Sequence, residues 1–355
     1  MEPPEGRLTE PAGVVEPGTR CIGVDGGATG FRLARVEFVP GHGLQTCSQV
    51  VRGDWPRDSD FVPLPLGEQQ AQLADPRRSG VEQKLEGAWV QALARGVREL
   101  LAQGNEGGEG PGPLRLGIAL PGHKDSQGRG VLLMARGPRL LNFCSLLESE
   151  LNEGQEVAIC PLGSDGQDGG LGEEWAGEGS FGGRQSAFYL GLGTGLAEAA
   201  KVDGTLLDVQ GLARGGAPPW EALVPGESCS IEEAASLGSI LKRLEEDRGP
   251  GLRPLDAARA GEPLALRLLE RSARVLGAWL AQRIRAAGGE GADPITRVVI
   301  GGSGAQLLGD PKLRFFRQHL GSALGSHELL PTRLDTPALF GSAARALGLT
   351  GSRPS

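Results

Sequence analysis

A glycine-rich turn between two apolar runs is the first stretch of this chain that could do chemistry. The run Cys21–Val24 leads into Asp25, Gly26 and Gly27, and a second run with period-two alternation follows, which predicts strand, tight turn and strand. Backbone N–H groups in such a turn can bind a phosphate, and the Thr29 hydroxyl can reach its oxygens. A strand-end carboxylate such as Asp25 can hold Mg²⁺ through water. An ordinary glycine-rich hairpin fits the stretch equally well.

The same pattern returns later in the chain. The apolar run 186–191 leads into a second turn, Gly193-Thr194-Gly195, and another strand-like run follows this turn. Two such hairpins, each opening a series of strands and helices, suggest two related lobes that face each other across a bound nucleotide.

A third glycine turn follows the apolar run 297–300 and contains Gly301, Gly302 and Gly304. Before it, apolar residues recur with a period near 3.6 and predict a long amphipathic helix over 264–287. Each glycine motif is a weak signal by itself, but the three in this order form a stronger one.

A further carboxylate, Asp165, follows a predicted strand over 156–160 and precedes a predicted helix. A carboxylate at a strand end beside a cleft can act as general base toward a hydroxyl group. Helix N-caps use the same residue types, and either Ser164 or Asp165 would fill that position. The spacing does not choose between these roles. Asp168, about one helical turn further on, is a rival for the base.

Composition excludes several classes of protein. The chain has 355 residues, of which 39% are hydrophobic and 23% charged, enough for two packed lobes. A net charge of −8 without clustered Lys and Arg argues against a nucleic-acid surface. The N-terminus lacks a cationic, apolar leader, and no run of about 18 apolar residues occurs, so we expect a cytoplasmic protein outside the membrane. The five cysteines lack zinc or redox spacing.

The order of predicted elements divides the chain into two α/β lobes. Residues 1–17 are rich in Pro, Glu and Gly and are expected to form a mobile tail. We expect an N-terminal lobe over 18–163 and a C-terminal lobe over 164–335. A closing helix that returns to the N-terminal lobe, with a short tail, is expected over 336–355.

Two further elements are expected in the N-terminal lobe. Residues 52–80 form a polar, Pro-rich stretch that is long for a loop, and its Trp55 and Phe61 favour a partly ordered lid. Apolar residues then recur at helical spacing and predict an amphipathic helix over 81–103.

Together these residues resemble the ROK (repressor, ORF, kinase) sugar kinases of the actin, Hsp70 and hexokinase superfamily, over about Arg20 to Leu349. The matching motifs are DGGATGFR (25–32), GIALPG (117–122), SDGQDGGLGE (164–173), GTG (193–195), GGSG (301–304) and TPALFGSAARAL (336–347). The resemblance implies two actin-like (ribonuclease H-like) α/β lobes around a nucleotide cleft.

The resemblance also implies an ATP- and Mg²⁺-dependent kinase that phosphorylates a hydroxyl of a hexose or amino sugar, like a glucokinase or an N-acetylhexosamine kinase. Asp165 would be the general base, and Asp25 would place Mg²⁺ through water. The implied nucleotide- and phosphate-binding residues are Asp25, Gly26, Gly27, Thr29, Gly193, Thr194, Gly195, Gly301, Gly302 and Gly304. The implied substrate-binding residues are Pro121, Gly122, Ser164, Asp165 and Glu232.

The sequence departs from the family pattern in several places. Ser164 stands where the family has Asn. Many members carry a Gly-Glu-x-Gly-His segment whose Glu touches the sugar and whose His binds zinc, but this chain has GAPPW at 216–220. The family's cysteine-rich zinc loop is reduced to Cys229, so we expect no structural zinc. Glu232 aligns with a family sugar-binding glutamate, although an exposed acid at a helix N-terminus is the alternative.

Other functions stay open. A sugar-sensing regulatory protein (pseudokinase) of the same fold would keep the lobes and lose the chemistry. A DNA-binding repressor is disfavoured, because about 20 residues before the first phosphate strand are too few for a helix-turn-helix module. The expected partners are a small-molecule sugar and a nucleotide, with no nucleic acid and no membrane, and a homodimer is left open.

Overall fold

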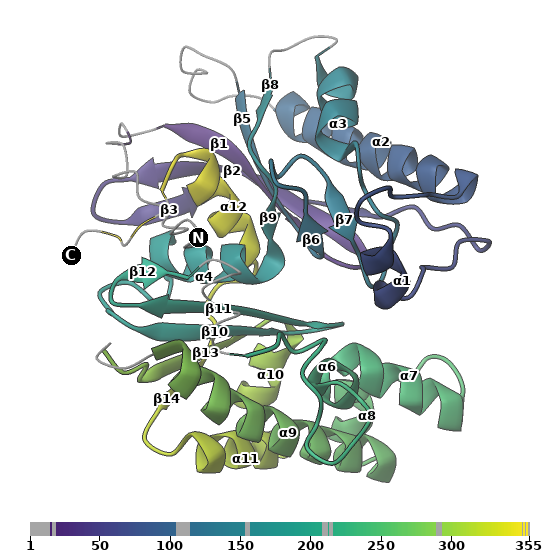
Figure 1. Cartoon of the computed structure of the whole chain (residues 1–355). Coiled ribbons are helices and arrows are strands. Elements are labelled where there is room, and N and C mark those ends of the chain that lie inside the picture. The colour runs from purple at the N-terminus through teal and green to yellow at the C-terminus, as the bar shows by residue number, and fades with distance from the viewer. Residues whose placement is uncertain are drawn as a thin grey trace, which may run out of the picture. The chain divides into compact units, whose positions relative to one another are not determined.

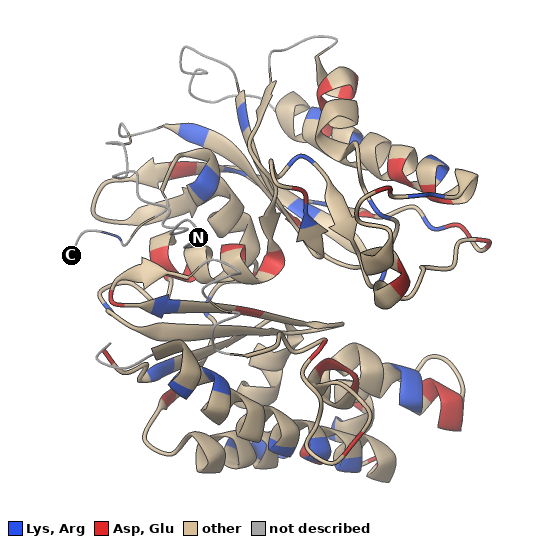
Figure 2. Ribbon diagram, in the orientation of Figure 1, with Lys and Arg blue, Asp and Glu red and all other residues tan. Residues whose placement is uncertain are grey.

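The computed structural model describes residues 19–103, 114–152, 157–207, 216–288 and 293–349, together with residues 15, 212, 351 and 353. The predicted tail over 1–17 lies outside these residues, apart from residue 15. None of the described helices has the length and hydropathy needed to cross a membrane. Lys and Arg occur in both parts of the chain, interspersed with Asp and Glu (Figure 2).

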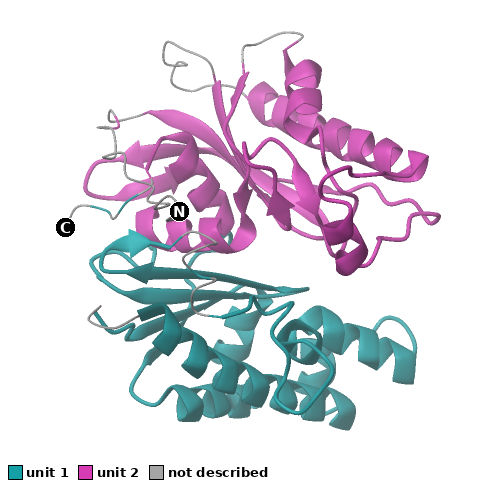
Figure 3. Cartoon of the chain, in the orientation of Figure 1, with its two compact units in different colours: residues 1–9, 178–337, 351–355 teal, residues 10–177, 338–350 magenta. Residues whose placement is uncertain are grey.

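The chain folds into two compact units, each built around a mixed β-sheet (Figures 1 and 3). Unit 1 contains the described parts of 178–337, and unit 2 contains those of 10–177 and 338–350. The predicted fold class, α/β with two lobes, is confirmed. The lobe limits expected after residues 163 and 335 stay a prediction; the compact units meet after 177 and 337.

The sheet of unit 2 has the order β3-β2-β1-β5-β8, with β4 beside β2 and β9 beside β5. Its described strands are β1 (Arg20–Gly26), β2 (Gly30–Val39), β3 (Gly43–Thr46), β4 (Val51–Asp54), β5 (Leu114–Leu120), β8 (Val157–Ile159) and β9 (Gly163–Ser164). Strands β1, β5 and β9 run parallel, and Asp25 lies opposite Ala119. Leu120 lies opposite Ser164 in the next pair. The carboxyl ends of these three strands therefore meet at one edge of the sheet.

Five helices and a small hairpin complete the described part of unit 2. They are α1 (Leu66–Ala71), α2 (Gly80–Ala102), α3 (Phe143–Leu151), α4 (Asp165–Trp175) and α12 (Pro337–Ala346), with the hairpin β6 (His123–Lys124) and β7 (Val131–Leu133). The helix predicted over 81–103 is confirmed as α2. Its residues Leu85, Trp89 and Leu93 join the strands in one hydrophobic core.

Helix α12 packs directly on the backbone of the unit 2 sheet. A Cβ atom on Gly117 would collide with the carbonyl oxygen of Ser342, and one on Gly23 would collide with that of Leu339. The Ser342 hydroxyl accepts a hydrogen bond from the N–H of Val24 (3.0 Å). Glycine is thus required at positions 23 and 117, because any side chain would push the helix off the strands.

Unit 1 repeats the hairpin-and-parallel-strand plan. Its sheet has the order β12-β11-β10-β13-β14. The described strands are β10 (Ala187–Leu192), β11 (Leu196–Val202), β12 (Thr205–Leu206), β13 (Arg297–Gly301) and β14 (Glu328–Pro331). The described helices are α6 (Ile231–Ala235), α7 (Leu237–Arg248), α8 (Pro254–Arg259), α9 (Pro263–Gly288), α10 (Ser303–Gly309) and α11 (Arg314–Leu324), with a 3₁₀ turn at Pro311–Leu313.

The long helix predicted over 264–287 is confirmed as α9, which lies beside α11 (Figure 1). Its buried Arg283 forms an ion pair with Glu198 of β11, with N–O distances of 2.6 and 2.9 Å. The same guanidinium group donates to the carbonyl oxygen of Gly216 (2.6 Å). The segment that begins at Gly216 is thus bound to α9.

Residues 52–80, expected as a lid, contain the end of β4 and α1 and are held by buried contacts. Trp55 stacks on Trp89 of α2 with ring centroids 4.4 Å apart. The Gln69 side chain is buried, and it donates to the Met134 carbonyl (3.0 Å) and accepts from the Met134 N–H (2.9 Å). The segment is therefore attached to α2 and to Met134, the residue that follows β7.

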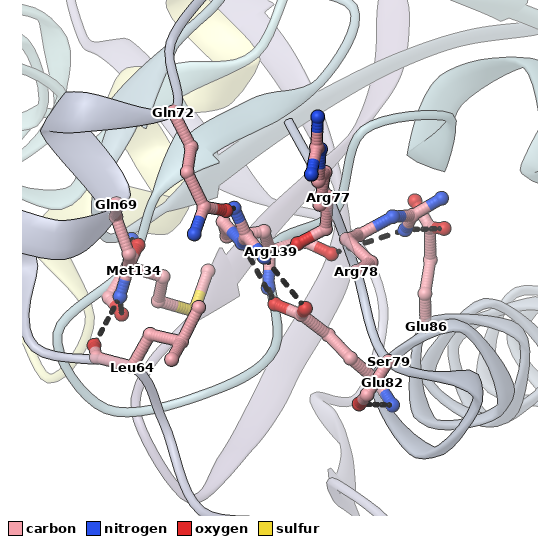
Figure 4. Close-up of polar contacts among 10 residues, drawn as sticks. All are labelled: Leu64, Gln69, Gln72, Arg77, Arg78, Ser79, Glu82, Glu86, Met134 and Arg139. Atoms are coloured by element: carbon pink, nitrogen blue, oxygen red, sulfur yellow. Dashed lines mark hydrogen bonds and ion pairs between the residues drawn. The ribbon is translucent and has the colours of Figure 1, made fainter. Parts of the chain in front are cut away.

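A further attachment is made by the buried guanidinium group of Arg139 (Figure 4). Its Nε and Nη2 atoms donate to the two carboxylate oxygens of Glu82, at 3.0 and 2.9 Å. It also donates to the side chain of Gln72 (3.1 Å) and to the carbonyl of Arg77 (2.5 Å). A buried charge is stable only when its partners satisfy it, so Arg139 fixes this segment against α2.

A second ion pair lies beside the first, between Arg78 and Glu86 (Figure 4). The Glu86 carboxylate also accepts from the N–H of Asn142 (2.7 Å). The two ion pairs join residues 72–79 and 139–142 to Glu82 and Glu86 of α2. These contacts join the segment to the rest of unit 2, and its expected role as a lid stays a prediction.

Replacing Arg139 by Met should lower the free energy of unfolding by about 3 to 5 kcal/mol, because it leaves the Glu82 carboxylate buried without its partner. Chemical denaturation monitored by Trp fluorescence measures this change. The double variant Glu82→Met with Arg139→Met should recover part of the loss. Arg57→Met, at an exposed position of the same segment, should stay within about 0.5 kcal/mol of the unsubstituted protein. An Arg139→Met protein as stable as Arg57→Met would contradict this account.

Candidate active site

The carboxylate of Asp25 lies near the end of β1, at the edge where the parallel strands end. Burial raises its pKa from 3.8 to about 6, the positive charge of Arg32 opposes the shift, and the negative charge of Asp165 adds to it. Asp25 and Asp165 are thus near enough to interact electrostatically. A pair of acids at a strand-end edge suits a site that binds a cation and moves a proton.

Asp165 is the first residue of α4 and follows β9 directly. The N-cap of this helix is Ser164, whose hydroxyl accepts from the N–H of Gln167 (3.1 Å). Capping therefore does not require the Asp165 carboxylate. Burial raises the pKa of Asp165, while the positive charge of Lys124 and backbone N–H groups, including that of Gly166 (3.0 Å), lower it.

Asp168, the rival for the base, is buried and has a structural partner. Its carboxylate forms an ion pair with Arg345 of α12. The two helices touch at this point, because a Cβ on Gly341 would collide with the Asp168 carbonyl, and one on Gly163 would collide with the Arg345 guanidinium. The Asp168 carboxylate therefore joins α4 to α12.

Lys124, which sequence reasoning did not single out, lies in the same region. Its Nζ atom donates to the carbonyl oxygens of Leu120 and of Gly122 (2.8 Å for the latter). Burial lowers the pKa of Lys124 from 10.5 to about 8, and the negative charges of Asp165 and Asp168 oppose that shift. The sequence signal that could have found it is a lysine two residues after the Pro-Gly turn of a strand end.

Pro121 and Gly122 follow β5 and lead into the small hairpin of β6 and β7. Gly122 has a φ of 89°, a left-handed conformation that favours glycine. A Cβ there would also collide with the carbonyl oxygen of Leu133. The turn predicted to lie under the sugar therefore requires glycine for two independent reasons.

The first predicted phosphate turn is held by Trp55. The Gly27 N–H donates to the Gly30 carbonyl (2.9 Å), which closes the turn. The indole N–H of Trp55 donates to the Gly27 carbonyl (2.8 Å), and its backbone N–H donates to the Thr29 carbonyl (3.0 Å). Thr29 is exposed at the tip, and Gly26 packs against the Leu120 side chain.

The second predicted phosphate turn has the same closure in unit 1. The Gly193 N–H donates to the Gly195 carbonyl (3.0 Å), and Thr194 is exposed at the tip. The Gly193 carbonyl accepts from the N–H of Leu237 at the start of α7 (2.9 Å). A Cβ on Gly193 would meet no atom within 4 Å. A hydrogen bond to the start of α7 thus holds the backbone of this turn, and there is open space beside Gly193.

Glu232 contacts the second turn. Its carboxylate accepts from the N–H of Leu196 (2.9 Å), and a Cβ on Gly195 would lie 2.9 Å from it. The N-terminus of α6 is capped separately, by the reciprocal hydrogen bonds of Ser230 and Glu233. Glu232 therefore bonds the predicted phosphate turn through Leu196, and its contact with a sugar stays a prediction.

The third glycine turn connects β13 to α10. Gly302 adopts a φ of 61°, and a Cβ on Gly301 would collide with the hydroxyl of Tyr189. A Cβ on Gly304 would lie 2.6 Å from the Leu192 side chain. The backbone therefore turns closely over the end of β10, the strand that precedes the second predicted phosphate turn.

The predicted site residues fall into two groups, one in each unit. Unit 2 holds Asp25, Gly26, Gly27, Thr29, Pro121, Gly122, Ser164 and Asp165, and unit 1 holds Gly193, Thr194, Gly195, Glu232, Gly301, Gly302 and Gly304. Within the parts of the chain that the structure describes, no three His, Cys, Asp or Glu side chains gather as a metal site.

Comparison with known proteins was made by sequence and by structure. No protein-family model matches the chain, and no curated protein does. Solved structures match over nearly the whole chain. The ROK hexokinase of Thermus thermophilus has 22% identity and a TM-score of 0.56, covering 94% of this chain and 97% of its own. The chain has the ROK fold.

Two further ROK structures extend the comparison. A ROK glucokinase of Streptomyces griseus, solved with glucose and AMPPNP, has 20% identity and a TM-score of 0.58, covering 92% of this chain and 98% of its own. A ROK transcriptional regulator, a homologue of the E. coli MLC protein, has 17% identity and a TM-score of 0.54, covering 93% of this chain and 79% of its own. The fold is thus shared with kinases and with a regulator.

Asp168→Asn should lower the free energy of unfolding by roughly 2 to 4 kcal/mol, because Arg345 loses its charged partner. Asp165→Asn should change it by less than about 1 kcal/mol, because Ser164 supplies the cap and Asn can still accept from Gly166. Thermal melting of the two proteins in parallel measures the difference. Equal melting temperatures would show that the ion pair does not hold α4 against α12.

Proposed function

We propose that this protein is an ATP- and Mg²⁺-dependent kinase that phosphorylates a hydroxyl of a hexose or amino sugar. The observation that carries the proposal is the meeting of Asp25, the Pro121-Gly122 turn and Asp165 at the ends of adjacent parallel strands. Ligands of open α/β sheets bind at such strand ends. The ROK fold and the glucose and AMPPNP bound by one solved relative support the same reading.

The residues fit a nucleotide phosphate and Mg²⁺ on physical grounds. Mg²⁺ prefers carboxylate oxygens, and the charge of Asp25 is balanced only in part by Arg32. The turn at Gly193 leaves open space where a side chain would otherwise stand, which lets a phosphate approach its backbone. Asp25 would hold the Mg²⁺, whose charge would neutralise the phosphate oxygens.

Asp165 is the proposed general base. Phosphoryl transfer depends on positioning and charge neutralisation more than on covalent chemistry. The protein needs one carboxylate that accepts the proton of the acceptor hydroxyl as the oxygen attacks phosphorus. Asp165 is suitable because its carboxylate is not needed for capping and, unlike that of Asp168, forms no contact ion pair with Arg345.

The substrate-binding residues in this proposal are Pro121, Gly122, Ser164, Asp165 and Glu232. Glu232 would act first by holding the second phosphate turn through Leu196. The remaining phosphate- and nucleotide-binding roles belong to Gly26, Gly27, Thr29, Gly193, Thr194, Gly195, Gly301, Gly302 and Gly304.

A sugar-sensing regulatory protein is the second candidate. Two observations favour it. One solved relative with this fold is a transcriptional regulator, and Ala217 and Trp220 replace the family's sugar-contacting Glu and its His. Such a protein would bind a sugar without transferring a phosphoryl group.

Mg-ATP should raise the melting temperature, because a ligand that binds only the folded state stabilises it by about 2.7 kcal/mol at 100 times its Kd. Gly193→Val should fold normally, since its side chain enters open space, and should lose this stabilisation. Gly321→Val in α11, another open position in unit 1, is the matched control and should keep it. No shift for the unsubstituted protein at millimolar Mg-ATP, with or without sugars, would refute the phosphate site.

Asp165→Asn should lower kcat by about 10² to 10⁴, the usual contribution of a positioned base, while Mg-ATP binding is retained. Because burial raises the pKa of Asp165, kcat/KM should begin to fall with decreasing pH above the ordinary aspartate range. Asp60→Asn, exposed in the same unit, is the control. Turnover of Asp165→Asn equal to that of Asp60→Asn would remove Asp165 from the mechanism and favour the sensor.

A further inference from the structure

The ammonium group of Lys124, in unit 2, has no role in the kinase mechanism proposed above. Lys124 lies in β6, immediately after the Pro121-Gly122 turn. Two of its three N–H groups are fixed by the carbonyl oxygens of Leu120 and Gly122. Carbonyl groups at the end of β5 thus hold the positive charge in one place, whereas a lysine on the surface would move freely.

That place lies beside the proposed base. Leu120, whose carbonyl binds the Lys124 ammonium, is paired with Ser164 in the parallel ladder of β5 and β9. Asp165 is the next residue after Ser164. The positive charge of Lys124 is the largest of the influences that oppose the effect of burial on the Asp165 pKa, and the charge of Asp165 is the largest that opposes its effect on the Lys124 pKa.

The other charges around this group are accounted for. Asp168 of α4 is neutralised by Arg345 of α12, and the charge of Asp25 of β1 is opposed by Arg32 of β2. Asp168 still raises the pKa of Lys124, and Arg345 lowers it. Asp165 raises the pKa of Asp25. Lys124 is therefore the cation that offsets the Asp165 charge most strongly.

We propose that Lys124 is a positioning residue for Asp165, whose carboxylate it keeps ionised and ready to accept the acceptor's hydroxyl proton. This role rests on the proposed kinase function. In the reaction, the hydroxyl O–H bond breaks, its proton passes to Asp165, the new O–P bond forms, and ADP leaves with the electron pair of the broken P–O bond. Lys124 keeps its proton throughout. Once Asp165 is protonated, the positive charge of Lys124 is unbalanced, which favours the return of the Asp165 proton to water.

A titration that needs no catalysis tests this role. The carboxyl ¹³C resonance of Asp165, assigned through Asp165→Asn, is followed against pH in the unsubstituted protein and in Lys124→Met. Loss of the cation should move the midpoint to higher pH, because a neighbouring positive charge favours the carboxylate. Lys84→Met, which removes an exposed lysine of the same unit, should leave it unchanged. An unchanged midpoint in Lys124→Met would overturn the proposal.

The reciprocal measurement covers the case in which Lys124→Met does not fold. Coupling between two sites is mutual, so Asp165→Asn should move the titration of the Lys124 Nζ group, followed by ¹⁵N or ¹³Cε resonances, to lower pH. Lys124→Arg keeps the charge and should leave the Asp165 midpoint near that of the unsubstituted protein. If the Lys124 titration midpoint is the same in Asp165→Asn as in the unsubstituted protein, the proposal is overturned without any Lys124 variant.

Kinetics separates this role from a merely structural one. In Lys124→Met, kcat/KM should fall roughly tenfold more at about pH 5.5 than at about pH 8, because less of the Asp165 is ionised at low pH. An equal loss at every pH would mean that Lys124 only supports the hairpin. If the unsubstituted protein transfers no phosphate to any sugar, the kinase function fails, and the two titrations still decide whether Lys124 controls Asp165.

Discussion

The contact of helix α12 with the backbone of β1 and β5 is the constraint on which unit 2 depends. The helix can reach the strands because positions 23 and 117 carry no side chain, and the Ser342 hydroxyl bonds the N–H of Val24 inside the contact. The same helix supplies Arg345, which neutralises the buried Asp168 of α4. One helix from the end of the chain thus fixes the elements that carry Asp25 and Asp165. A displacement of α12 would therefore change the positions of Asp25 and Asp165.

The charges of the proposed site follow from that packing. Burying a carboxylate is costly unless a cation or hydrogen bonds offset it, and the three acids of this region are offset in different ways. Asp168 forms a contact ion pair and serves the fold. The positive charges of Arg32 and Lys124 oppose the effect of burial on Asp25 and Asp165, and burial raises the pKa of all three acids. In the proposed kinase, Asp25 would bind Mg²⁺ and Asp165 would accept the proton of the sugar hydroxyl.

Local patterns in the sequence were sufficient for the elements that have a strong period or a glycine turn. The helices over 81–103 and 264–287 were found within one residue at each end, because their apolar faces repeat every 3.6 residues. The pattern could not show contacts between residues distant in sequence. Asp168 with Arg345, Glu232 with Leu196, and Lys124 with Leu120 all depend on the fold. No local pattern in residues 52–80 predicts that Arg139 binds them.

The most direct test of the central claim is the release of ADP by the purified protein with Mg-ATP and a panel of neutral hexoses and N-acetylated or free amino sugars. The kinase account predicts ADP release that depends on at least one sugar, with little release in its absence, because kinases that close on their substrate exclude water from the reaction. The phosphorylated sugar should form in equal amount. If a sugar raises the melting temperature and yet no sugar in the panel stimulates ADP release, the kinase account is contradicted and the protein senses that sugar without phosphorylating it.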